Sequence, residues 1–124
     1  MSSPAPLPIE IHRSAQRGEL QKVVKWLRKG GPVGALCPTT TSGGWATAET
    51  LLHAAAGYDQ LEMVRELLKR GASIDLLSGL GVTALMGAAG GGHLSIVCFL
   101  LQHSADPDLQ AEDGLTALML AAGP

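Results

Sequence analysis

The chain has 124 residues, of which 46% are apolar and only 3% are aromatic, and its formal net charge is −2. A chain of this length suits one compact domain, and its core must be built from aliphatic side chains. The negative net charge gives no general attraction to nucleic acid or to acidic membranes, so we expect neither as a partner.

We expect residues 1–7 to be disordered and a single domain to run from residue 8 to residue 124. The opening stretch MSSPAPLP lacks both the basic and the apolar region of a secretory signal peptide. The apolar stretch at residues 94–101 is too short to span a bilayer. We therefore expect a cytoplasmic protein, with the nucleus as the alternative location and with no insertion into membranes.

Residues 8–33 form the first of several similar units. It contains the stretch IHRSAQRGELQKVVKWLRKGGPV, which begins at Ile11 and matches a later stretch at an interval of 41 residues. His12 aligns with His53, and Gly30 aligns with Gly71. The following units repeat every 33 residues, so the first connection is eight residues longer than the others. The stretch GALCPTTTSGGWAT contains this insertion and is rich in turn residues, which predicts an inserted loop at residues 34–46.

Residues 47–76 and 80–109 form the second and third units. The stretch TLLHAAAGYDQLEMVRELLKRGASID, which begins at Thr50, aligns without a gap with TALMGAAGGGHLSIVCFLLQHSADPD, which begins at Thr83. Each contains two short helices. Thr50 and Thr83 are suited to cap the first helix of their units. Gly71 is suited to end the second helix in the left-handed conformation, and Ser104 replaces it in the third unit at some expected loss of stability.

The second helix of each unit carries an apolar stripe at helical spacing. The stripe consists of Leu61, Val64, Leu67 and Leu68 in the second unit and of Leu94, Val97, Leu100 and Leu101 in the third. A unit this small cannot bury its own stripe, so neighbouring units are expected to stack as a solenoid.

Residues 113–124 begin a fourth unit that is incomplete. Thr116 can cap a helix through residue 122, but no second helix follows it. Its ALMLAA stretch then lacks a cover, whereas a terminal repeat normally presents a polar outer face. We expect a piece of a longer repeat array whose C-terminal end frays or self-associates.

The shared pattern GxTxLxxAAxxGHxxxVxxLLxxxA, at 33 residues, resembles the ankyrin repeat, and the resemblance covers about residues 8–123. The TPLH box of that family is degraded to TLLH at Thr50, to TALM at Thr83 and to TALM at Thr116. The resemblance implies an all-α fold, an α-solenoid of stacked helix-turn-helix repeats with short β-turn fingers. It implies a protein–protein interaction module that binds a protein or peptide on its concave face. The alternative is a regulatory or targeting part of a larger enzyme, of the kinase or ubiquitin-ligase type.

No catalytic constellation is visible in the sequence, so no enzyme, cofactor or metal site is expected. His53 and His12 could act as general bases, but in an ankyrin-like unit such a histidine holds neighbouring turns through hydrogen bonds. Cys37 and Cys98 do not form a metal-binding spacing, and Cys98 is expected to be buried in its apolar run. The stretch GAAGGGH lacks the Lys-Ser/Thr ending and the preceding strand of a phosphate-binding loop.

The family resemblance also indicates which positions face a partner. Trp45 and Tyr58 belong to residue types that often dominate binding energy, although the Trp45 ring could instead fold back on its own unit. The basic stretch KVVKWLRKGG is either the polar face of a helix or a docking surface for an acidic partner. The full set of expected partner-binding residues is Gln16, Arg17, Trp45, Thr47, Glu49, Tyr58, Leu80, Val82, Glu112, Asp113 and Leu115.

Overall fold

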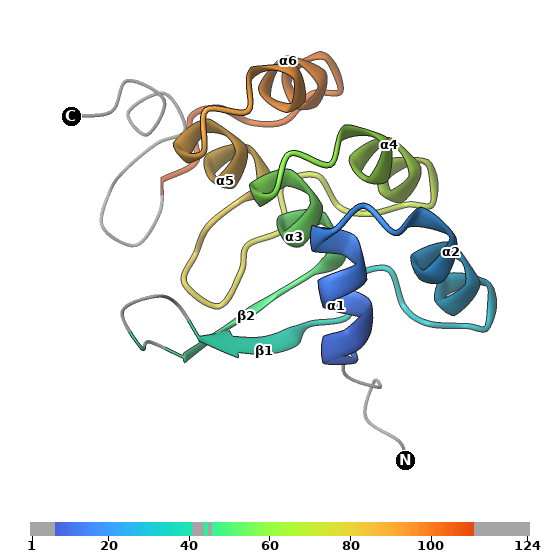
Figure 1. The fold of residues 1–124 in the computed structure, drawn as a ribbon. Helices are drawn as coiled ribbons and strands as arrows, with labels where there is room; N and C mark the ends of the chain where they lie inside the picture. The colour runs from blue at the N-terminus through green and yellow to red at the C-terminus, as the bar shows by residue number, and fades with distance from the viewer. Residues whose placement is uncertain (1–6, 41–43, 45, 111–124) are drawn as a thin grey trace.

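The structure, a computed structural model, describes residues 7–40, 44 and 46–110. Within these residues, six α-helices form three consecutive pairs (Figure 1). The pairs are α1 (Ile9–Gln16) with α2 (Leu20–Arg28), α3 (Leu51–Gly57) with α4 (Leu61–Lys69), and α5 (Ala84–Gly90) with α6 (Leu94–Gln102). The expected fourth unit at residues 113–124 and residues 1–6 of the segment expected to be disordered lie outside the described part. Leu7, the last residue of that segment, is buried, and its backbone N–H donates to the Leu36 carbonyl at 3.1 Å, so the expected disorder is wrong for this residue.

The three pairs stack in order along the chain, as the repeat period predicts. The inner helix α3 packs between α1 and α5, and the outer helices α2, α4 and α6 each pack on their own inner helix (Figure 1). Alanine side chains make the close approach of the inner helices possible. Ala55 and Ala56 of α3, and Ala88 of α5, are fully buried between neighbouring helices.

Threonine caps begin two of the inner helices, as predicted. The Thr50 Oγ1 accepts a hydrogen bond from the backbone N–H of His53, and the Thr83 Oγ1 accepts one from that of Met86. In return, the backbone N–H of Thr50 donates to His53 Nδ1 and that of Thr83 donates to Met86 Sδ. The methionine sulfur therefore takes the place of the imidazole nitrogen in the third unit.

Left-handed residues end the outer helices, also as predicted. Gly71 follows α4 with φ of 93°, and Ser104 follows α6 with φ of 71°. A side chain in this region is strained by contact with its own backbone, which glycine avoids. Ser104 is therefore a local source of strain in the third unit.

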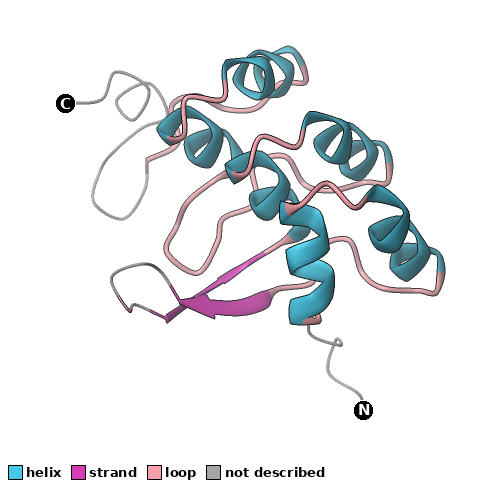
Figure 2. Cartoon of the chain, in the orientation of Figure 1, coloured by secondary structure: helices cyan, strands magenta, loops and turns pink. Residues whose placement is uncertain are grey.

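The connection between the first two units is not the loop that the sequence predicted, so the all-α assignment is wrong in this respect. Strands β1 (Cys37–Thr40) and β2 (Ala46–Glu49) form an antiparallel hairpin in which Cys37 pairs with Glu49 (Figure 2). The eight extra residues give this finger enough length to pair with itself, and its threonines suit a strand. The hairpin also joins the next finger, because the Gly79 N–H donates to the Ala48 carbonyl at 2.8 Å.

Two predictions about the outer helices are also wrong. The stripe of α6 does not begin at Leu94, which is 70% exposed, whereas the stripe of α4 is confirmed, because Leu61 packs against the core together with the buried Val64 and Leu67. Cys98 is exposed rather than buried, because it lies on the same outward face of α6 as Leu94, one helical turn away. An unbroken apolar run does not show which side of a helix faces the core.

Candidate functional site

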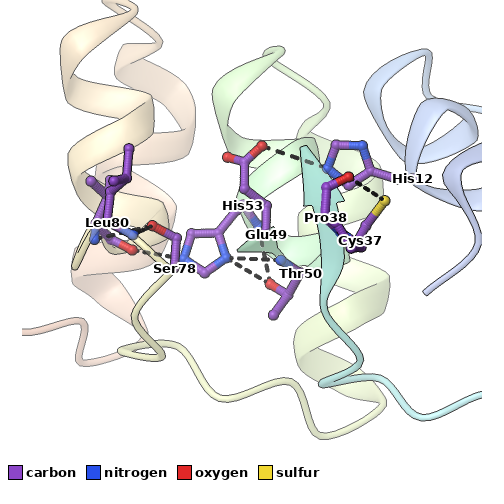
Figure 3. Close-up of polar contacts among 9 residues, drawn as sticks. His12, Cys37, Pro38, Glu49, Thr50, His53, Ser78 and Leu80 are labelled. Atoms are coloured by element: carbon purple, nitrogen blue, oxygen red, sulfur yellow. Dashed lines mark hydrogen bonds and ion pairs between the residues drawn. The ribbon is translucent and has the colours of Figure 1, made fainter. Parts of the chain in front are cut away.

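His53 joins two neighbouring units through both of its ring nitrogens (Figure 3). Its Nδ1 accepts from the backbone N–H of Thr50 at 3.2 Å, so its Nε2 carries the proton and donates to the Val82 carbonyl at 2.8 Å. The side chain is 6% exposed, and burial lowers the pKa of the imidazole below its ordinary value. Neither nitrogen remains to accept a proton from a substrate, which supports the structural interpretation of this histidine.

His12 occupies the matching position in the first unit but has a different partner. Its Nε2 lies 3.6 Å from Glu49 Oε1, and this nitrogen has no hydrogen-bond partner among the described residues although the residue is only 1% exposed. The nearby His12 ring is the main cause that lowers the pKa of Glu49, so this carboxylate is ionised at neutral pH. Burial, followed by the negative charge of Glu49, raises the pKa of the Cys37 thiol across the hairpin, which keeps it protonated.

Residues 60 and 93 form a second set of equivalent links between units. Gln60 Nε2 donates to the Gln16 carbonyl at the end of α1, and His93 Nε2 lies 3.0 Å from the Gly57 carbonyl at the end of α3. Each side chain therefore ties one unit to the end of the preceding inner helix. These links fix the geometry of the inner side of the stack.

A groove of about 330 Å³ lies between α1 and the hairpin, on the inner side of the stack. Tyr58 borders it with 59% of the residue exposed. Ionised Glu49 and exposed Arg13 supply opposite charges, and hydroxyl and amide groups supply further donors and acceptors. The lining residues are Ile9, His12, Arg13, Gln16, Pro38, Thr39, Thr40, Glu49 and Tyr58.

The structure brings together only part of the predicted partner-binding set. Gln16, Glu49 and Tyr58 line the same groove, whereas Arg17 lines another groove on the end of the stack. The remaining described members are Thr47 in the hairpin and Leu80 and Val82 in the next finger, which is the connection between α4 and α5. Trp45, Glu112, Asp113 and Leu115 lie outside the described residues.

Thr47 and Val82 have structural contacts of their own. Thr47 Oγ1 is buried next to Gly79, where an added Cβ would lie only 3.0 Å from it. The Val82 carbonyl accepts the hydrogen bond from His53. Thr47 therefore contacts the next finger, and Val82 links that finger to α3, which a position-by-position transfer from the family does not reveal.

Thr39 and Thr40 line the groove from β1 but were not predicted as partner-binding residues from the sequence. A signal for them exists, since TTTSGGWATA places three threonines before a pair of glycines and one threonine after it, a pattern that is typical of a hairpin. Arg13 and Ile9 were also not predicted. They lie on a face of α1 that becomes one wall of a groove only because the β1–β2 hairpin packs beside it.

Among the described residues, no group of three or more His, Cys, Asp or Glu side chains lies close enough to hold a metal ion. In residues 7–40, 44 and 46–110, no helix is long and apolar enough to cross a bilayer.

The comparison with protein families decides how the three helix pairs are classified. A family model for ankyrin repeats, in three copies, matches residues 11–111. The chain belongs to the ankyrin repeat family. A search of curated proteins finds no match to it.

Ankyrin repeats are generally protein–protein interaction modules, and the family is typically non-catalytic. The matched residues begin inside α1 and cover the rest of the three helix pairs together with their fingers. In this chain the finger between the first and second ankyrin repeats is the β-hairpin, and it is this enlarged finger that forms one wall of the groove.

Proposed function

We propose that this ankyrin repeat domain binds a segment of another protein in the groove between α1 and the hairpin, and that it does so without catalysis. The observation that carries the proposal is the combination of an exposed tyrosine with opposite charges in one groove. Tyr58 offers a large contact area with few rotatable bonds, and Glu49 and Arg13 lie beside it.

The residues around the groove are held in place by contacts within the domain, so a partner does not have to order them on binding. The Gln60 link holds the end of α1, and the Cys37–Glu49 pair begins the hairpin ladder next to the groove. A preorganised surface loses little conformational entropy on association. The volume of about 330 Å³ suits one or two side chains of a partner segment rather than a whole domain.

Selection of peptides on the immobilised chain, followed by calorimetry with the selected peptides, tests the proposal. We expect Tyr58→Ala to weaken binding at least about tenfold, as truncation of a central aromatic does. Leu77→Ala is the matched control, because this leucine is also exposed but lies outside the groove. Circular dichroism of both variants should match that of the parent chain.

An unchanged affinity in Tyr58→Ala would refute the groove as the binding site. Binding through the outer helices on the convex side would then be the better hypothesis. Trp45→Ala is expected to weaken binding as well, which stays a prediction from the sequence. The alternative role as a part of a larger enzyme, self-association, and the cytoplasmic or nuclear location also stay predictions.

A further inference from the structure

The positive charge of this chain is concentrated in its first ankyrin repeat. Six of the nine Lys and Arg residues lie between residues 13 and 29, whereas the first repeat holds only two of the eleven carboxylates, Glu10 and Glu19. The first repeat is therefore basic and the remainder acidic, although the net charge is only −2.

The folded chain collects these cations around one groove. The groove has a volume of about 570 Å³ and is lined only by α1, α2, the turn between them and Lys29 directly after α2. These two helices form one end of the stack of described repeats (Figure 1). Because α1 and α2 pack as a pair, cations from both helices face the groove. Its charged residues are Arg13, Arg17, Lys22, Lys25, Lys29, Glu10 and Glu19.

Most of these cations are not neutralised by neighbouring carboxylates. Lys22 pairs with Glu19 at 3.0 Å, and this pairing lowers the pKa of Glu19. None of the other four has a carboxylate within 4.0 Å in the part of the chain that the structure describes. The groove therefore retains an excess of positive charge.

Apolar side chains line the same end groove as the cations. Trp26 and Ile11 line the groove, and both are partly buried against the core. The Trp26 ring lies against the backbone of Gly31, where any Cβ would collide with it. The indole is thus held in place and offers a fixed apolar contact between cationic side chains.

We propose that this end groove, defined by the charged residues above with Ile11 and Trp26, docks an acidic amphipathic segment of a partner protein. Carboxylates of the segment meet the unpaired cations, and an apolar side chain meets Trp26. A nucleic acid fits less well, because Glu10 and Glu19 interrupt the cations and repel a continuous phosphate backbone. Arg13 lines both grooves, but the other four cations of the end groove do not line the groove beside the hairpin.

Fluorescence of Trp26 provides a direct test. The chain contains two tryptophans, so Trp45→Phe leaves Trp26 as the only reporter. The probes are a synthetic helical peptide with Glu on one face and Leu on the other, the same peptide with Gln in place of Glu, and a single-stranded oligouridylate. We expect the Glu peptide to change the Trp26 emission and to bind about tenfold or more tightly than the Gln peptide, with an advantage that shrinks as salt is added.

Matched charge reversals locate the binding. Lys25→Glu should weaken binding of the Glu peptide about fivefold, the size expected when one exposed attraction becomes a repulsion. Lys69→Glu changes the net charge equally but lies on α4 outside this groove, and it should leave the affinity within about twofold. Tyr58→Ala should also leave it unchanged, which separates this surface from the first groove.

The proposal is overturned if the two peptides bind equally, if the Glu peptide does not bind at low salt, or if Lys69→Glu weakens binding as much as Lys25→Glu. The first two results would show that the basic end is only a solvated polar cap. Tighter binding of the oligouridylate than of the Glu peptide would replace the protein partner by a nucleic acid.

Discussion

Replacement of His53 by methionine isolates one hydrogen bond between repeats, because the chain itself shows what methionine does at this position. Met86 accepts from the Thr83 N–H at 3.5 Å, so a methionine in place of His53 should keep the corresponding cap of α3. What His53→Met loses is the bond of 2.8 Å from Nε2 to the Val82 carbonyl. A hydrogen bond of this kind contributes about 0.5–1.5 kcal/mol net. Since Val82 is only partly buried, water can reach part of the site, and we expect a loss of about 1 kcal/mol at pH 7.

The same substitution should change how stability depends on pH. Burial lowers the pKa of folded His53, so below the unfolded value of about 6.5 the unfolded chain binds a proton that the native side chain excludes. Stability of the parent chain therefore falls as pH falls from about 6.5 towards the native pKa, by at most about 1.4 kcal/mol per pH unit. Methionine binds no proton, so the difference between variant and parent should shrink on acidification. Glu49, whose pKa is also lowered, loses its contribution only below about pH 4.3, outside this window.

Urea unfolding followed by circular dichroism between pH 7.5 and about 5.5 measures both effects. His103→Gln is the control, because it removes an exposed histidine that follows α6. The reasoning is refuted if His53→Met unfolds with the same pH dependence as the parent chain. It is also refuted if the variant is as stable as the parent at pH 7.

Three further outcomes test other parts of the structure. Leu67→Ala should lower the free energy of unfolding by about 2–5 kcal/mol, since Leu67 is fully buried. Leu101→Ala should lower it much less, because that residue is 44% exposed. Equal losses in urea melts would contradict the packing of the outer helices. Ser104→Gly should raise the free energy of unfolding by roughly 0.5–1 kcal/mol by removing the strain at φ of 71°, and a loss of stability in urea melts would count against it. A thiol reagent should label Cys98 rapidly in the native protein but Cys37 only on unfolding, because the Cys37 thiol is buried and its pKa is raised. Rapid labelling of a Cys98→Ser variant would show that the hairpin does not protect Cys37.

The contrast between His12 and His53 shows where sequence matching stops. The two residues align, and the sequence predicts a structural role for both. In the structure His53 donates to a backbone carbonyl, while the ring of His12 meets the side chain of Glu49. The eight inserted residues change the path of the finger above His12, and an alignment of helices carries no information about that path.

The sequence by itself determined the number and order of the helix pairs, their threonine caps and the left-handed residue that ends each outer helix. These features depend on contacts within a few positions, and they recur at a fixed period. Only the tertiary structure decided that Tyr58, Glu49 and Arg13 border one groove and that α1 and α2 turn five cations to one end of the stack. A groove exists between elements rather than within one. Its lining depends on how the hairpin leans on α1 and on which face each helix turns outward, and both are set by packing between segments distant in the chain.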